Sequence, residues 1–448
     1  MTLDRSLVPE PGSAPLLSLP GPERSTLDNG LKLSTVRRSR LPETALSLVL
    51  PAGAASTAVD RAGLASLVAR VLPEGAAGRG AREMAKWLDG IGLQLGVAVG
   101  YDSMVVQVHT LSEQITPALD AIAAVVLEPS FLDDEVERCR DQRVDSIRRA
   151  RDEPAEVAAD VLAELLFGDH PYGRLARGRE DTVRRFRRAD LVEFHHDRFS
   201  APSATLVACG DLPANFDLLV ERRLGGWGGP EVENGPPPSA SRVADPGIFL
   251  VDRPGSQQSE IRIGSLGLQR GSPDEPAVRV TNAILGGLFN SRLNMNLRED
   301  KGWTYGARST LSLRRSRGPL TMSAAVETRV TGAAVREMLH EAARMCESFP
   351  SADEMRTAAG ALTRSLPLRF ETNAQIAGKI VEQEVYGLPE DYWPAYSSRI
   401  EAVSGPQVRE MSARLLDPIS LAVLVVGDAS IVAPALEELG PIRLREAP

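Results

Sequence analysis

Two side chains in the second half of the chain have the chemistry to polarise a carbonyl group. Arg298 and Tyr305 lie on either side of Gly302, where the pattern predicts that a helix ends. A guanidinium and a phenol both donate hydrogen bonds, so the two side chains could converge on one carbonyl oxygen. The alternative is that Arg298 lies on a solvated face and Tyr305 packs at the start of a strand. The spacing is compatible with both interpretations.

The histidines offer no recognisable metal site. A helical zinc site needs ligands three or four residues apart on one face, whereas His195 and His196 are adjacent and point in different directions. The chain contains no H-E-x-x-H or H-x-x-E-H sequence, no G-x-S-x-G elbow, no P-loop and no strand–G-x-G-x-x-G–helix unit. The common serine-hydrolase, nucleotide-binding and dinucleotide-binding motifs are therefore excluded.

Length and composition indicate an ordinary globular protein. The chain has 448 residues, of which 43% are hydrophobic and 25% charged, and its net charge is −9. Chains of this size usually divide into domains of about 100–250 residues, so two domains are expected. The longest apolar runs, 121–127 and 421–427, are far shorter than the roughly 20 residues that span a bilayer, and residues 1–20 lack the features of a signal peptide. The sequence predicts a cytoplasmic location and no membrane partner.

Cysteine and arginine patterns add no further site. Cys139, Cys209 and Cys346 are odd in number and form no C-x-x-C pair, which indicates reduced, packed thiols. Residues 184–188 include four arginines, but the chain is acidic overall and such clusters usually form a solvated helix start. No nucleic-acid partner is expected.

Periodicity predicts alternating strands and helices in the first half. Strands are expected within 31–51, at 93–99, at 104–110 and at 204–209. Helices are expected over 61–72 with Asp60 as the N-cap, and over 81–88, 113–127, 133–151, 155–166 and 189–198.

The second half repeats the first at an offset of about 216 residues. Segment 205–211 matches 422–428, and the strand and helix of 47–72 correspond to those of 260–285. Between the copies, residues 225–246 contain clustered glycines and three successive prolines, which is typical of a linker. We predict an α+β fold of two homologous domains, each a mostly antiparallel sheet with flanking helices. The predicted organisation is an N-terminal domain at 25–224, a linker at 225–246 and a C-terminal domain at 247–442.

A series of short motifs in fixed order gives the chain a family resemblance. From about residue 31 to residue 440 the chain resembles the pitrilysin/insulinase family of zinc peptidases, in the mitochondrial-processing-peptidase-like branch of half-length, paired subunits. The motifs are Gly63-Leu-Ala65, Glu137-Arg138, Asp152-Glu-Pro154, Leu166-Phe-Gly-Asp-His-Pro-Tyr-Gly173, Gly210-Asp211, Leu285-Gly-Gly287, Ser291-Arg-Leu293, Leu297-Arg-Glu299, Phe370-Glu-Thr372, Tyr386-Gly-Leu-Pro389 and Gly427-Asp428.

The chain departs from this family at the metal site. Active members carry H-x-x-E-H directly after the Gly-Leu-Ala of the first helix. Here Ser66, Ala69 and Arg70 stand in place of the first histidine, the general-base glutamate and the second histidine, and Ser146 stands in place of the distal glutamate ligand. Without two imidazoles and a carboxylate, the chain lacks both the zinc site and the base. We therefore expect no cofactor in this chain and no peptide hydrolysis by the chain alone.

What the chain retains resembles the other subunit of a heterodimer. In heterodimeric members a zinc subunit pairs with a metal-free subunit whose second domain supplies an Arg/Tyr pair, and Arg298 and Tyr305 match that motif at its spacing. The resemblance implies that both side chains hydrogen-bond the substrate carbonyl and stabilise the oxyanion. The expected function is that of the non-catalytic, substrate-binding subunit of a heterodimeric zinc metalloendopeptidase, which cleaves peptides in an enclosed chamber. The expected partners are a homologous subunit with H-x-x-E-H and its zinc, and an unfolded peptide.

Two alternatives stay open. The chain could be a stand-alone scaffold or peptide-binding protein, which would have no need of the Arg298/Tyr305 pair, or an active peptidase with an unrelated metal site. Other motif residues receive structural interpretations. His170 is predicted to cap or pack within its loop, and Gly96 replaces the usual asparagine of the edge strand on which active members bind substrate, which weakens the case for substrate binding by the first domain.

Overall fold

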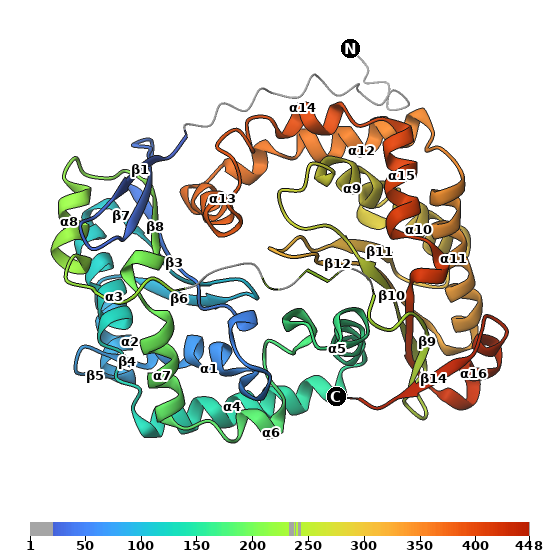
Figure 1. Cartoon of the computed structure of the whole chain (residues 1–448), viewed down its shortest axis with the longest axis horizontal. Helices are drawn as coiled ribbons and strands as arrows, with labels where there is room; N and C mark the ends of the chain where they lie inside the picture. Colours follow the sequence, from blue (N-terminus) through green and yellow to red (C-terminus); the bar gives the residue numbers. More distant parts are fainter. Residues whose placement is uncertain (1–20, 233–236, 238, 241–242, 448) are drawn as a thin grey trace, which may run out of the picture.

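The computed structural model describes residues 21–232, 237, 239–240 and 243–447. The first twenty residues, where no signal peptide is predicted, and part of the predicted linker lie outside the described residues. Figure 1 shows two sheet-containing halves on opposite sides of the molecule, with helices wrapped around them. In the described part of the chain no helix has the length and apolar character needed to cross a bilayer.

The first half contains a six-stranded mixed sheet in the order β1-β2-β8-β3-β7-β6. β2 and β8 are parallel, and the other neighbouring pairs are antiparallel. Its strands are β1 (Glu23–Thr26), β2 (Lys32–Arg37), β3 (Glu43–Leu50), β6 (Gln94–Val99), β7 (Met104–Leu111) and β8 (Thr205–Gly210). A separate two-stranded ribbon pairs β4 (Gly75–Ala76) with β5 (Arg79–Gly80).

The second half repeats this topology in the order β14-β9-β13-β10-β12-β11. Here β9 is parallel to β13, as β2 is to β8, and the rest of the antiparallel pattern matches strand for strand. The halves differ at one edge, where β14 adds in parallel to β9 whereas β1 pairs antiparallel with β2. The strands are β9 (Gly247–Asp252), β10 (Gln258–Leu266), β11 (Ala307–Leu311), β12 (Pro319–Glu327), β13 (Ala422–Gly427) and β14 (Ile442–Arg445). The predicted α+β fold with an internal duplication is confirmed.

Sixteen α-helices lie in the described part of the chain, and all six helices predicted for the first half are present. The sheets reach slightly beyond the predicted domain limits, since β1 begins at Glu23 and β14 ends at Arg445, and the limits themselves stay a prediction. The helices are α1 (Leu64–Val71), α2 (Ala81–Gly90), α3 (Ile115–Leu127), α4 (Asp133–Asp152), α5 (Pro154–Phe167), α6 (Glu180–Val183), α7 (Arg188–Arg198), α8 (Phe216–Leu224), α9 (Glu275–Asn282), α10 (Arg292–Asn294), α11 (Thr331–Glu347), α12 (Ala352–Arg364), α13 (Asn373–Tyr386), α14 (Tyr396–Glu401), α15 (Gly405–Leu415) and α16 (Ala429–Glu437).

The start of α1 corrects one prediction. Asp60 is not its N-cap, because a 3-10 turn occupies Val59–Arg61 and the helix begins after Gly63, whose φ is +96°. A side chain at Gly63 would meet the Cα of Gly178 at 2.7 Å. Gly63 and Gly178 thus allow the loop before α6 to approach the start of α1 closely. This contact, rather than capping by Asp60, determines where the helix begins.

Each half contributes one helix to the sheet of the other half. α5 packs against β10 and β13 of the second sheet, where Val161 and Leu165 join a cluster that contains Phe249 and Leu424. α13 packs against β3 and β8 of the first sheet. Figure 1 shows both helices between the two halves. The exchange of α5 and α13 ties the halves together through buried apolar surface.

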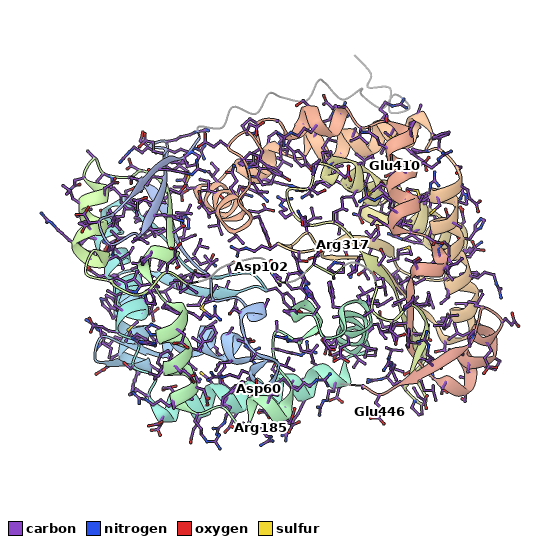
Figure 2. All side chains as sticks on the ribbon, viewed as in Figure 1. Asp60, Asp102, Arg185, Arg317, Glu410 and Glu446 are labelled. Carbon is purple, nitrogen blue, oxygen red and sulfur yellow. The ribbon has the colours of Figure 1, made fainter. Side chains whose placement is uncertain are left out.

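Polar contacts join the halves at the centre of the molecule. Figure 2 shows Asp102, at the tip of the β6–β7 hairpin, and Arg317, in the β11–β12 connection, in the middle of the view. The Asp102 carboxylate accepts hydrogen bonds from the Tyr172 hydroxyl at 2.5 Å and from the Arg315 amide at 3.3 Å. The Tyr172 hydroxyl also accepts one from the Ser316 amide at 3.3 Å. We call this contact between the two hairpin tips the central junction.

Candidate functional site

The four positions that the family resemblance predicts to correspond to a zinc site lie on α1 and α4. Ser66 and Ala69 are buried on α1, Arg70 is exposed near its end, and Ser146 is half-buried on α4. The two helices pack against each other, so the sequence places the four positions on neighbouring elements. The side chains at these positions offer two hydroxyls, a methyl group and a guanidinium.

Cations surround these positions. The Arg143 guanidinium, one helical turn before Ser146, donates a hydrogen bond to the Ser66 carbonyl at 3.3 Å, and Arg70 donates one to the Gln142 side chain at 2.5 Å. Burial lowers the pKa of Arg143, and the positive charges of Arg70 and Arg177 lower it further. Zinc does not fit this donor set, because guanidinium groups cannot ligate a cation and they repel it. Within the described residues, no group of three or more His, Cys, Asp or Glu side chains could hold a metal ion.

Arg177 links this region to α5. Its guanidinium forms ion pairs with Asp160 and, at 3.1 Å, with Glu156, both on α5. The close contact between Gly63 and Gly178 fixes the loop that carries Arg177. Burial raises the pKa of Asp160 to about 6, the neighbouring Arg177 opposes that rise, and the Glu156 and Glu164 carboxylates add to it. The Asp160 carboxyl therefore changes its charge near pH 6.

A pocket of about 560 Å³ opens beside the substituted metal positions. Its lining comes from both halves: Ser66 of α1, Val99 at the end of β6 and several residues of α5 on one side, and β11 and β12 on the other. Four arginines line it, namely Arg177, Arg262, Arg308 and Arg314, together with the carboxyls of Glu156 and Asp160. The pocket is the natural candidate for a binding site, because it combines a concave surface with converging polar groups.

Arg298 and Tyr305 lie on an exposed segment of the second half. Arg298 belongs to a short π-helix, Met295–Asp300, which ends before Gly302 at a φ of +65°. Its guanidinium lies over the Phe289 ring, 4.9 Å from the centroid, and pairs with Glu299 at 3.3 Å. Tyr305 is 96% exposed just before β11. In the described structure no hydrogen bond joins the two side chains, so both are available to another molecule but they are not locked together.

The remaining sequence interpretations concern single residues. The His170 ring accepts a hydrogen bond from the Tyr172 amide at 3.0 Å, so the predicted capping role is confirmed. β6 is an edge strand, with Gly96 paired to Gln107 on its inner neighbour. Cys139, Cys209 and Cys346 are free thiols, and burial raises the pKa of each.

Sequence reasoning missed the arginines that surround the lost metal site. Arg143 lies three residues before Ser146, so helical periodicity alone could have placed it beside that position. Arg177 and Asp160 are far from α1 in sequence, and no spacing rule indicates their contact. The same holds for Arg308 and Arg262, which strand pairing places in one row on either side of Ser323.

The amino-acid sequence matches two profiles of one peptidase family. Residues 35–178 match the family described as insulinase, peptidase family M16, and residues 185–362 match a domain described as the peptidase M16 inactive domain. Together these matches cover more than half of the chain. The chain therefore belongs to the insulinase (M16) peptidase family, as the motif resemblance predicts.

Individual relatives agree with this assignment. An uncharacterized zinc protease of Mycobacterium bovis is 28% identical over 311 residues, which cover 68% of this chain and 70% of the relative. Subunit 1 of the mitochondrial cytochrome b-c1 complex of Bos taurus is 25% identical over 273 residues, covering 60% of this chain and 56% of the subunit. This protein is similar to both of these chains over more than half of its length.

Solved structures show the same fold. The crystal structure of a peptidase M16 inactive domain from Pseudomonas fluorescens superposes with a TM-score of 0.84 at 24% identity, covering 91% of this chain and 98% of that one. A Helicobacter pylori protease gives a TM-score of 0.84 at 15% identity, covering 91% and 100%.

Proposed function

We propose that this chain is the non-catalytic, substrate-binding subunit of a heterodimeric zinc metalloendopeptidase. The partner is a homologous subunit that carries H-x-x-E-H, and the pair encloses unfolded peptides in a chamber and cleaves them. The proposed location is the cytoplasm. The chain alone has no peptidase activity, and the zinc belongs to the partner subunit.

One observation carries the proposal. Tyr305 is 96% exposed and forms no side-chain hydrogen bond within the described structure. The Arg298 guanidinium is half-exposed, and its contacts are the Phe289 ring and the adjacent Glu299 carboxylate. A phenol that packed for stability would be buried. The family's Arg/Tyr pair is thus available to a substrate, while the metal positions of the same chain hold Ser66, Ala69 and Arg70.

In the proposed heterodimer, the two subunits contribute different groups to the reaction. The partner subunit supplies the activated water and the base that takes its proton. Arg298 and Tyr305 donate hydrogen bonds to the oxygen of the scissile carbonyl, whose negative charge grows as the water oxygen bonds to the carbonyl carbon. The two side chains are not joined in this chain alone, so the proposal requires that partner and substrate hold them at the carbonyl oxygen. Their effect then falls on the rate of the chemical step.

Association with a zinc-bearing homologue tests the proposal. The purified chain is mixed with an H-x-x-E-H-bearing homologue from the same organism, first of all one encoded beside it, and the mixture is separated by size-exclusion chromatography. A complex with one copy of each chain supports the proposal. A stable homodimer that binds none of these homologues would favour the alternative, a stand-alone scaffold or peptide-binding protein.

A further inference from the structure

The inner face of the second sheet is only partly covered. α5 lies over β10 and β13, and the Leu162 and Leu166 side chains come so close to β10 that a side chain at Gly264 would meet them at 3.1 Å. Next to this contact, β12 and the edge strand β11 turn the same face toward the pocket. The side chains that face it are Arg308 and Thr310 of β11 and Thr321 and Ser323 of β12.

Strand pairing arranges these side chains in two rows. Arg262 of β10 is paired with Ser323 of β12, which is paired with Arg308 of β11. The next row on the same face is Gly264, Thr321 and Thr310. Because neighbouring strands lie about 4.8 Å apart, two arginines stand roughly 10 Å apart on either side of one serine hydroxyl. A carboxylate between them can accept hydrogen bonds from both guanidiniums and from the hydroxyl.

The charge of the pocket favours an anion. Arg308 is exposed and forms no ion pair or side-chain hydrogen bond within the described residues. The Arg314 guanidinium is held between aromatic rings, 4.0 Å from the Tyr101 centroid and 4.7 Å from that of Tyr172, and its buried Nη1 has no hydrogen-bond partner in the described structure. Arg262 is already paired with Glu260 at 2.6 Å. With Glu260 included, four arginines thus face three carboxyls, and within the described residues Arg308 and Arg314 have no carboxylate partner.

The position of β11 at the edge of the sheet suggests that the anion beside Arg262, Ser323 and Arg308 belongs to an extended peptide. One side of β11 pairs with β12, and the other side is the edge of the sheet. At this edge the Ala307 amide already donates to the Asn294 side chain and Gly286 packs against Ser309, so an extended chain would pair with the remaining backbone groups of β11. A peptide that adds to this edge places a side chain in every second position beside Arg308 and Thr310. A carboxylate of that peptide would then lie next to the unpaired guanidinium.

We infer that the pocket binds a carboxylate of an extended peptide between Arg308 and Arg262, over the Ser323 hydroxyl. The carboxylate is either the C-terminus of the peptide or the side chain of an acidic residue. This inference rests on the proposed function in one respect, namely that the ligand is a peptide. On this inference, the inner face of the second sheet, which lines the pocket beside Ser66, selects peptides that carry a carboxylate.

Peptide binding to the isolated chain tests the inference without any cleavage. The probes are short, N-terminally labelled peptides of one sequence, made with Asp or Asn in the centre and with a free or amidated C-terminus, and binding is followed by fluorescence anisotropy. We expect the neutral peptide, with Asn and an amide, to bind at least about tenfold more weakly than the best carboxylate peptide. The free-acid and Asp peptides distinguish the two sources of the carboxylate.

Substitution of Arg308→Gln should reduce the affinity for carboxylate peptides about tenfold and leave the neutral peptide unaffected. The matched control is Arg356→Gln, because the Arg356 side chain is 73% exposed on α12 and does not line the pocket. Arg308 is itself exposed, so its replacement should leave the far-ultraviolet circular dichroism unchanged. Equal binding of all four peptides, or an equal effect of both substitutions, would overturn the inference.

The outcome is independent of the heterodimer. If carboxylate peptides bind through Arg308 and no zinc-bearing homologue associates, the pocket assignment holds and the proposed function fails. If a homologue associates and the pair cleaves peptides with no preference for carboxylates and no effect of Arg308→Gln, the proposed function holds and the pocket assignment fails.

Discussion

At the scale of single residues, cations lie at and beside the positions where the family resemblance predicts zinc ligands. Arg70 occupies one of these predicted positions, and Arg143 donates a hydrogen bond to the carbonyl of Ser66, which occupies another. A single lost ligand could be replaced by a neighbouring side chain, whereas several guanidiniums oppose any divalent cation. The proposed function assigns the catalytic contribution of this chain to the exposed hydrogen-bond donors Arg298 and Tyr305.

Replacing either donor should slow the reconstituted pair without preventing its assembly. Removal of one oxyanion donor typically costs about 10²- to 10³-fold in rate, so Tyr305→Phe and Arg298→Gln should each reduce kcat by about that factor. Tyr305 is almost fully exposed, so the phenylalanine variant should keep its thermal stability. Arg356→Gln serves as the exposed-arginine control. If the heterodimer that contains the Tyr305→Phe variant has the same kcat as the parental heterodimer, the role assigned to Tyr305 is contradicted.

The pKa of Asp160 predicts how peptide binding depends on pH. Burial raises this pKa to about 6, so the carboxyl is negatively charged above that pH and neutral below it. Its ionisation is balanced by Arg177, with Glu156 and Glu164 on the same helix and Arg179 as the other nearby charges. A peptide carboxylate stays ionised down to about pH 5. Affinity for carboxylate peptides should therefore rise a few-fold as the pH falls from about 7.5 to about 5.5.

The control for this dependence is Asp160→Asn, which keeps the side-chain size and cannot ionise. This variant should bind carboxylate peptides tightly at both pH values, in anisotropy titrations with the labelled peptides. A pH dependence that survives in Asp160→Asn would assign the effect to another group and contradict this prediction.

The sequence supports a hypothesis about the metal positions, but it does not predict which side chains surround them. Ser66, Ala69 and Arg70 can be compared with a motif position by position. Arg177 and Asp160 meet because Gly63 and Gly178 allow two loops into contact, and no local pattern encodes that approach. The row of Arg262, Ser323 and Arg308 depends on the register of three strands, which a sequence alone does not fix.

At the scale of elements, the central junction holds two hairpins that come from different halves. The Tyr172 hydroxyl donates to Asp102 and accepts from the Ser316 amide, so one side chain satisfies groups on both hairpin tips. Burial raises the pKa of Tyr172, and its hydrogen bond to the Asp102 carboxylate raises it further, so the phenol stays protonated. The pocket lies beside this junction, with Tyr101 and Arg314 in its lining.

Tyr172→Phe should lower the free energy of unfolding by about 2 kcal/mol, because it leaves Asp102 and the Ser316 amide without this partner. Chemical denaturation measures the change, and hydrogen exchange should increase in residues 312–318. Tyr396→Phe is a matched control, because the buried Tyr396 hydroxyl has no hydrogen-bond partner among the described residues and its removal should cost little. Equal stability of the Tyr172→Phe variant and the parent would show that the junction does not hold the hairpins.

Periodicity predicts most elements well and their ends less well. Helix α4, predicted at 133–151, ends at Asp152, because its length and charge pattern leave little ambiguity. The start of α1 differs because a tertiary contact at Gly63 overrides the local capping preference of Asp60. The repeat predicts two homologous domains, and the repeated segments do lie on equivalent strands, β8 and β13, of two sheets with matching strand orders.

At the scale of the whole molecule, the exchange of α5 and α13 makes the two halves mutually dependent. Sequence reasoning gives two domains and a linker, but amphipathic patterns do not reveal which sheet a helix covers. Each buried aliphatic side chain on these helices contributes about 1.5–3 kcal/mol. A specific protease site inserted within residues 225–246 should therefore yield a cut chain that still elutes as one species and separates only in denaturant. Separation of the two pieces in native buffer would contradict the mutual dependence.

The most direct test of the central claim is peptide cleavage by this chain alone, by an H-x-x-E-H-bearing homologue alone and by the two mixed, with zinc quantified in each sample. The proposed function predicts no activity and no stoichiometric zinc in this chain, and activity that appears only or mainly in the mixture. No gain on mixing, with the two chains remaining separate, would contradict the account and favour a scaffold or peptide-binding protein.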